Sequence, residues 1–238
     1  MDYNSYSNNQ FGQRAYGVTM SYDQYLSRAF RWMAAGLLLT FAVACTVAYT
    51  NLFFLVQTLY LPLTIAELAM VFILSARINH LQVNTARMLF LGYAALNGLV
   101  MSIYFVMFNA KTLVMAFLAS ALYFGIMAVY GARTQRNLMG WGHMLQAGLI
   151  ALLLCSVVGM LFGMGFMNSV VYSGIGLGLF MLITAWDVQM LQQRYQWASR
   201  DDAMLEKAAV FGALGLYLDF INIFLYVVRI FASSQRDN

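Results

Sequence analysis

Seven long apolar segments constrain this chain more than any other feature of its 238 residues. They cover residues 33–52, 58–76, 88–108, 112–131, 144–166, 169–191 and 208–231. A helix of about 20 apolar residues crosses the hydrocarbon core of a bilayer. Strands of a membrane barrel would alternate apolar and polar residues, whereas these segments are continuously apolar. The sequence therefore predicts an all-α membrane protein, a seven-transmembrane-helix bundle.

The composition agrees with this class. The chain is 62% hydrophobic and only 9% charged, whereas a soluble domain carries about 25% charged residues. The loops are too short to form separate domains. We expect a polar cytoplasmic N-terminal tail over residues 1–31, which ends in an interfacial helix from Tyr22 to Trp32. A transmembrane domain over 32–232 and a short polar C-terminal tail over 233–238 follow.

The basic residues predict the orientation. With the N-terminus inside, ten of the 13 Lys and Arg residues lie on the cytoplasmic side. They are Arg14, Arg28, Arg31, Arg77, Arg87, Arg133, Arg136, Arg194, Arg200 and Lys207. Cytoplasmic loops carry such an excess. We expect a multi-pass protein of the cell membrane, in a bacterial inner membrane rather than an ER membrane. The basic residues are scattered singly, so no nucleic-acid partner is expected.

The last segment leaves two topologies open. If residues 208–231 formed a re-entrant loop, the C-terminus would return inside and the charge bias would sharpen. The segment contains 24 residues, which exceeds what a half-span needs. Seven full crossings are therefore the favoured prediction.

Asp219 lies near the middle of this last segment, where a charged carboxylate is costly and is a candidate functional group. Polar and small residues recur with it at spacings of three and four, along one face of a helix. They are Gly212, Gly215, Asp219, Asn222, Tyr226 and Arg229. Because such a face cannot sensibly contact lipid, the last helix is predicted to be central in the bundle. The alternative role for Asp219 is a structural bond to a neighbouring helix.

Two further acids lie in apolar segments. Asp187 is near the cytoplasmic end of the sixth segment, with Thr184 one turn before it. Glu67 is midway along the second segment, which Arg77 closes. Ten residues separate Glu67 from Arg77, about 15 Å along a helix, so these two cannot pair. Asp187 could instead reach the interface, and Arg77 could be a positive-inside anchor.

The chemistry of these residues favours cation handling over catalysis. No set of nucleophile, base and oxyanion donor can be assembled, so we expect no enzyme and no cofactor. Two or three carboxylates with carbonyl and water oxygens would form a weak, transient Ca²⁺ site. Glu67, Asn222 and Tyr226 are candidates for the ion path.

Glycines spaced by four residues occur in two of the segments. Gly159 with Gly163, and Gly174 with Gly178, are expected to permit close helix packing.

Two motifs resemble a known family. The run Gly212-Ala-Leu-Gly-Leu-Tyr-Leu-Asp-Phe-Ile-Asn-Ile-Phe is similar to the C-terminal signature of the Bax inhibitor-1 family. Thr184-Ala-Trp-Asp-Val-Gln resembles that family's other acidic motif, in which Tyr more often replaces Trp186. The resemblance extends from about Tyr25 to near the C-terminus and is closest to the bacterial branch.

The resemblance implies a pH-sensitive Ca²⁺ leak channel. Asp187 and Asp219 would form a hydrogen-bonded, proton-sharing pair that serves as gate, pH sensor and transient Ca²⁺ ligand. Arg77 is the nearest match to an arginine that interacts with the pair, and Glu67 matches an acid that only some members carry. Two buried carboxyl groups that share a proton hold their helices together. When the pair loses this proton, the two carboxylates are both negative and repel each other. The gate would close in acid and open in base.

One geometric problem accompanies this prediction. From the segment bounds, Asp219 lies near mid-membrane, whereas Asp187 lies closer to the cytoplasmic surface. Pairing would need the last helix to start deeper than its bounds indicate.

The sequence leaves two other functions open. A proton-coupled calcium exchanger could use the same acids as carriers. A non-conducting regulator would instead bind a membrane protein partner, such as a protease or a cell-death or stress protein. Besides the lipid bilayer, the expected partners are calcium ions and protons, and the regulator alternative adds a membrane protein.

Overall fold

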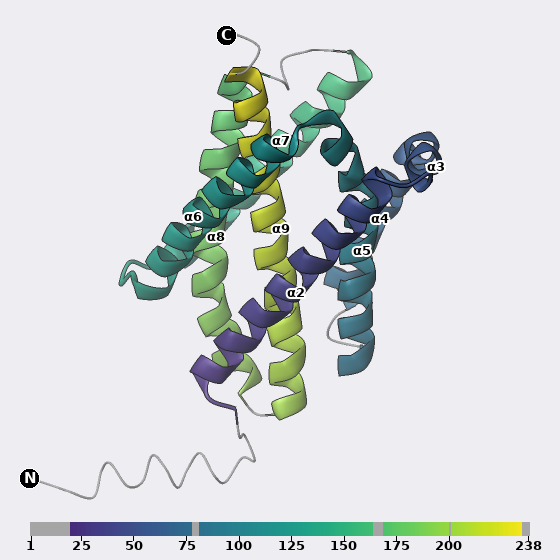
Figure 1. Ribbon diagram of the computed structural model, residues 1–238. Coiled ribbons are helices and arrows are strands. Elements are labelled where there is room, and N and C mark those ends of the chain that lie inside the picture. The colour runs from purple at the N-terminus through teal and green to yellow at the C-terminus, as the bar shows by residue number, and fades with distance from the viewer. Residues whose placement is uncertain (1–19, 78–80, 164–168, 200, 235–238) are drawn as a thin grey trace, which may run out of the picture.

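The computed structural model describes residues 20–77, 81–163, 169–199 and 201–234 (Figure 1). Within these ranges every regular element is a helix. The elements are α2 (Tyr22–Ala48), α3 (Leu52–Thr58), α4 (Tyr60–Arg77), α5 (Val83–Met107), α6 (Ala110–Arg133), η2 (Leu138–Trp141), α7 (Gly142–Leu161), α8 (Val170–Ala198) and α9 (Asp202–Ser234). The all-α prediction is confirmed.

Helix α9 is the central element. In its most apolar window 67% of the residues are buried, against 17% to 44% in the other five long apolar helices. It packs against α2, α5, α6 and α8. Figure 1 shows α9 running the length of the bundle, with α8 on one side, α5 on the other and α2 crossing it. The predicted central position of the last helix is confirmed.

Six of the described helices are long and apolar enough to cross a membrane. Helix α9 has 33 residues without a break, about 50 Å at 1.5 Å per residue. That length favours a full crossing over a re-entrant loop. The second predicted segment corresponds to α4, which α3 precedes at an angle of 76°, and the pair forms the seventh crossing if it is one span.

Helix α2 differs from its prediction. An interfacial helix over Tyr22 to Trp32 was expected to be separate from the first span, but one helix runs unbroken from Tyr22 to Ala48. Ser21 and Gln24 form a capping box at its start, which stabilises a helix end. Tyr25 and Ala29 are fully buried. The first turns therefore pack with the bundle, and the expected boundary at residue 31 falls inside a helix.

Side-chain and glycine caps define several of the helix ends. The Asn109 side chain accepts a hydrogen bond from Thr112 N at 2.8 Å, and Ser169 Oγ accepts one from Tyr172 N at 3.1 Å. Gly163 has a φ of 62° just beyond α7, a left-handed conformation that terminates helices and favours glycine. These caps make sharp ends between long apolar helices.

Close helix contacts occur at glycines other than Gly163, Gly174 and Gly178 of the predicted pairs. Gly174, Gly178 and Gly163 have open space where a Cβ would lie, so the packing role expected for them is wrong within the described residues. A Cβ on Gly131 of α6 would instead lie 2.9 Å from both the carbonyl carbon and Cα of Ala185 on α8. Spacing alone does not reveal which glycines face another backbone.

Candidate functional site: the carboxyl pair between α8 and α9

The predicted polar face of α9 lies against α8. Each step of one or two turns along α9 is matched by a similar step in the opposite direction along α8, as expected for antiparallel helices. The positions that face each other are Gly212 with Leu191, Gly215 with Asp187, Asp219 with Thr184, and Tyr226 with Gly176. This register places Asp219 one turn along α9 from the position that faces Asp187, and the two carboxyl groups interact.

Asp219 is the buried member of the pair, with only 3% of its surface exposed. Its carboxyl group interacts with Asp187 and with the hydroxyl of Thr184. Thr184 Oγ1 also lies 2.8 Å from the Phe180 carbonyl oxygen, to which it donates a hydrogen bond. Asp219 Oδ2 is buried without a hydrogen-bond partner among the described residues. A buried carboxylate oxygen of this kind calls for a proton or a cation.

A cavity of about 390 Å³ lies beside the pair. It is lined by Leu145, Gln146, Leu149, Phe180, Ile183, Trp186, Asp187, Arg194, Phe211, Leu214, Gly215, Leu218, Asp219 and Asn222. Most of these side chains are apolar, and the charged ones are the two aspartates and Arg194. The cavity therefore places both carboxyl groups and one cation in a site that water or an ion can share.

The depth problem is resolved by α8 rather than by α9. Helix α8 continues to Ala198, beyond the predicted end of its span at residue 191. Asp187 lies 11 residues before this end, and Gly215 lies 13 residues after the start of α9 at Asp202. Both positions are therefore about 16–20 Å from the turn between the helices, and Asp219 lies one turn further along α9. The expectation that α9 must start deeper was wrong.

Arg194 is the described arginine that reaches the pair. It lines the same cavity and interacts electrostatically with Asp187, seven residues earlier on α8. Its guanidinium also lies 4.5 Å from the ring centroid of Phe211. Arg77, the predicted partner, ends α4, and its side chain lies outside the described residues. A spacing of seven residues marks one helix face and could have identified Arg194.

The other predicted residues of α9 take different positions. Asn222 lines the cavity, and its amide donates a hydrogen bond to Leu218 O at 2.7 Å. Tyr226 packs against Phe180, with ring centroids 6.0 Å apart, and does not line the cavity. The Arg229 guanidinium lies 5.6 Å from the Tyr226 ring centroid. Among the predicted ion-path residues of α9, only Asn222 adjoins the carboxyl pair.

Glu67 belongs to a separate polar cluster. It accepts hydrogen bonds from Asn97 and from the hydroxyl of Tyr93, the latter at 3.3 Å. The Tyr93 ring packs against the Tyr217 ring of α9, with the ring centroids 5.8 Å apart. Tyr217 in turn hydrogen-bonds Thr40 at 2.6 Å. Glu67 therefore connects α4 to the core through α5 and does not line the cavity of the aspartate pair.

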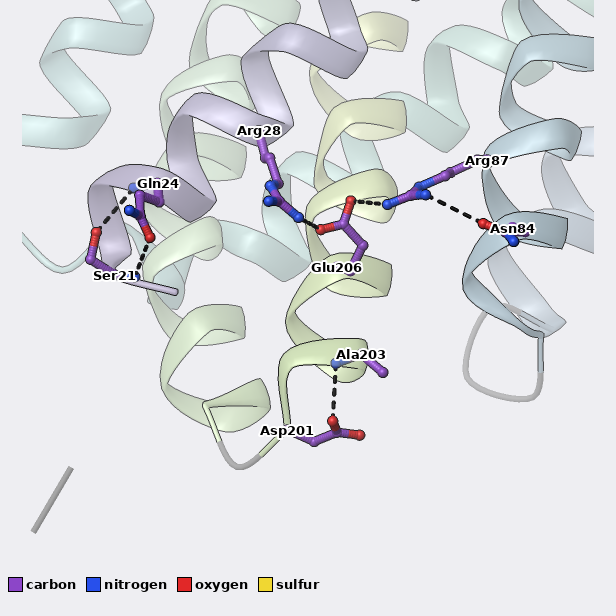
Figure 2. A network of polar contacts seen from close by, with 8 residues as sticks. All are labelled: Ser21, Gln24, Arg28, Asn84, Arg87, Asp201, Ala203 and Glu206. Atoms are coloured by element: carbon purple, nitrogen blue, oxygen red, sulfur yellow. Dashed lines mark hydrogen bonds and ion pairs between the residues drawn. The ribbon is translucent and has the colours of Figure 1, made fainter. Parts of the chain in front are cut away.

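A third charged cluster lies at the end of the bundle where α2, α5 and α9 begin, here called the lower end. Glu206 of α9 forms ion pairs with Arg28 of α2 and Arg87 of α5 (Figure 2). The Glu206 side chain is only 9% exposed. It precedes the apolar segment that begins at residue 208. Burial acts to raise the pKa of Glu206, but the hydrogen bonds from Arg87 and Arg28 outweigh it and hold the pKa below its usual value. This cluster was not predicted.

Together, the fold and the site define an all-helical, multi-pass membrane protein with two carboxyl groups facing each other between its last two helices. A family model described as "Inhibitor of apoptosis-promoting Bax1" matches residues 22–236. The chain belongs to this family, the Bax inhibitor-1 family.

Similar proteins occur in distant bacteria. The inner membrane protein YbhL of Escherichia coli is 40% identical over 217 residues, which cover 89% of this chain and 92% of the relative. A protein of Deinococcus radiodurans is 38% identical, covering 90% and 91%. One from Borreliella burgdorferi is 32% identical, covering 90% and 94%. The similarity therefore extends over nearly the full length of each protein.

Proposed function

We propose that this protein is a pH-sensitive Ca²⁺ leak channel whose gate is the Asp187–Asp219 pair. The observation that carries the proposal is the position of these two carboxyl groups, opposite each other beside a cavity of about 390 Å³. Intramembrane acids that face a cavity commonly mark ion or proton pathways. Cation passage suits this site because the two carboxyl groups bring four oxygen atoms to the cavity.

The gate works through proton sharing. When one proton is shared between Asp187 and Asp219, a hydrogen bond ties α8 to α9 and the site stays closed. When the proton leaves, two negative charges repel each other in a medium of low dielectric constant. The helices then separate, or the charges recruit a cation or Arg194. Flux is therefore low in acid and high in base.

In this proposal Ca²⁺ binds to the aspartate pair only transiently, as the transported ion. Ca²⁺ takes six to eight oxygen ligands, and the described residues contain no group of three acidic, His or Cys side chains. Carbonyl and water oxygens would complete the coordination of an ion that binds weakly and leaves.

The proposed location is a bacterial inner membrane with the N-terminus in the cytoplasm. The similar protein YbhL is an inner membrane protein of Escherichia coli. The excess of basic residues on the N-terminal side supports this orientation. The orientation can be tested with variants that carry a single cysteine in one loop. Labelling each cysteine with a reagent that cannot cross the membrane shows on which side that loop lies.

The deciding experiment measures Ca²⁺ uptake by proteoliposomes at several pH values. The wild type is expected to conduct more as the pH rises. In Asp219→Asn the amide can donate permanently to Asp187 and imitate the protonated pair, so uptake should stay low at every pH. The matched control is Asp23→Asn, which changes an exposed acid in the first turn of α2. If Asp219→Asn conducts like the wild type at every pH, the proposal is wrong.

The same preparation separates the alternatives. A calcium exchanger would carry Ca²⁺ only when a proton gradient is imposed, whereas a leak follows the Ca²⁺ gradient alone. A regulator without flux would carry no ions when purified, and its binding to a membrane partner would survive Asp187→Asn and Asp219→Asn.

A further inference from the structure

The cluster at the lower end borders a second cavity that the proposed channel does not use. Its volume is about 430 Å³. It is lined by Arg28, Arg31, Trp32, Ala35, Arg87 and Glu206. These residues come from the N-terminal halves of α2, α5 and α9. In Figure 2, Arg28 and Arg87 approach Glu206 from opposite sides. Three helices thus contribute to one site.

The charge of the cavity is strongly positive. Three arginines line it together with one carboxylate, Glu206, which leaves two formal positive charges. Glu206 cannot neutralise the site. It instead fixes the Arg28 and Arg87 side chains in place, because it pairs with both.

The arginines retain hydrogen-bond donors for a ligand. Each guanidinium has five N–H groups in a planar fork. Arg87 uses Nη2 on Glu206 and Nη1 on Asn84, the latter at 3.3 Å. Its Nε is buried without a hydrogen-bond partner among the described residues. Arg31 is exposed at the cavity. Arg87 and Arg31 therefore bring N–H donors to a charged, open site where an acceptor can bind.

Phosphate matches these donors best. Arginine forks bind phosphate oxygens in pairs and with charge assistance. The cavity also has an apolar side. Trp32 and Ala35 line it next to the point where the apolar segment of α2 begins at residue 33. Tryptophan is typical of the level of lipid headgroups, and the Arg87 guanidinium lies 5.5 Å from the Trp32 ring centroid. A ligand that fits both sides has a phosphate next to an acyl region.

We propose that this cavity binds the phosphate of an anionic phospholipid at the lower end of the bundle. The charge bias predicts that this end faces the cytoplasm, where basic pockets between transmembrane helices bind anionic headgroups. A bound lipid would link the arginines of α2 and α5 through one headgroup. The proposal does not depend on whether the protein conducts Ca²⁺.

Native mass spectrometry of the full chain in detergent tests this proposal, with phosphatidylglycerol titrated against phosphatidylcholine. We expect one phosphatidylglycerol to bind in preference to phosphatidylcholine. Arg31→Gln should weaken this binding about fivefold, since a basic residue near the headgroup contributes roughly 1 kcal/mol. Arg31→Lys should retain most of it. Arg133→Gln, which removes an exposed arginine from the end of α6 instead, should have no effect.

Three outcomes would overturn the proposal. Equal weakening by Arg31→Gln and Arg133→Gln would mean that only the overall surface charge attracts the lipid. No weakening by Arg31→Gln would place the lipid elsewhere. If inorganic phosphate alone binds with the same dependence on Arg31 and displaces phosphatidylglycerol, the site belongs to a free phosphate. Arg31 is exposed, and equal melting temperatures will confirm that its variants fold.

Discussion

Gly215 of α9 lies directly against Asp187 of α8: a methyl group on Gly215 would be 2.8 Å from Asp187 Oδ2. The absence of a side chain at this position lets the carboxyl group of α8 approach the backbone of α9. One turn further along α9, Asp219 approaches the same carboxyl group. The separation of α8 and α9 at this level therefore sets the distance between the two acids.

Gly215→Ala should disturb the pair without removing either acid. The new methyl group would push the Asp187 carboxyl group away from Asp219, because a contact of 2.8 Å is too short for carbon and oxygen. Proton sharing would weaken, so Ca²⁺ uptake in acid should rise, and overpacking should cost about 1–3 kcal/mol. Proteoliposome flux and melting in detergent measure both effects. Gly174→Ala, where space is open, is the control, and equal behaviour of the two variants would contradict the prediction.

Arg194 should set the pH at which the gate opens. Its positive charge favours the ionised form of Asp187, with which it interacts across the cavity. Without that charge, deprotonation of the pair needs a higher pH. Arg194→Met is therefore expected to shift the half-maximal pH of Ca²⁺ uptake upward, by about one unit if the lost interaction is near 1.4 kcal/mol. Arg194→Lys keeps the charge and should stay near the wild type. An unchanged half-maximal pH in Arg194→Met would exclude Arg194 as a partner of the gate.

Periodicity in the sequence predicted the central features of this fold. The spacing of three and four around Asp219 correctly identified the face of α9 that meets α8, because a buried polar face must find a partner within the bundle. The structure places Asp187 opposite this face. Local patterns carry this kind of information well, since a helix repeats its own sequence positions in space.

Contacts between distant residues escaped the same reasoning. Glu206 lies 178 positions from Arg28 and 119 from Arg87, so no local spacing relates them. Arg194 was overlooked as a partner of Asp187 because the predicted span stopped at residue 191, whereas α8 continues to Ala198. Which glycines contact a neighbouring backbone also depends on how the helices are oriented against each other.

The ion pairs of Glu206 should make the folded protein less stable at acidic pH. The pKa of Glu206 is lower in the folded protein than its ordinary value of 4.5. Its ionised form therefore contributes stability that is fully present above pH 4.5 and is lost as the pH falls through the lower folded-state pKa.

Glu206→Gln tests this contribution. The variant should be less stable than the wild type at neutral pH by about 1 kcal/mol, since both arginines are partly exposed. The difference should shrink below pH 4.5. Melting temperatures in detergent across this range measure it, and Asp23→Asn serves as the exposed control. A difference that stays constant down to the lowest pH would show that the charge of Glu206 is not responsible.

Gly131 should be the least replaceable glycine of α6. A Cβ at this position would lie 2.9 Å from the Ala185 carbonyl carbon and Cα, and both atoms belong to a helix backbone that cannot rotate away. Gly131→Ala must therefore force α6 and α8 apart, at a cost of about 1–3 kcal/mol or more. Gly125, six residues earlier on the same helix, has open space around its Cβ position. Gly125→Ala should be neutral or slightly stabilising, because alanine favours the helix more than glycine does. Melting of the two variants in one detergent gives the comparison, and an equal loss of stability in both would mean that helix contact at Gly131 does not limit the packing of α6 on α8.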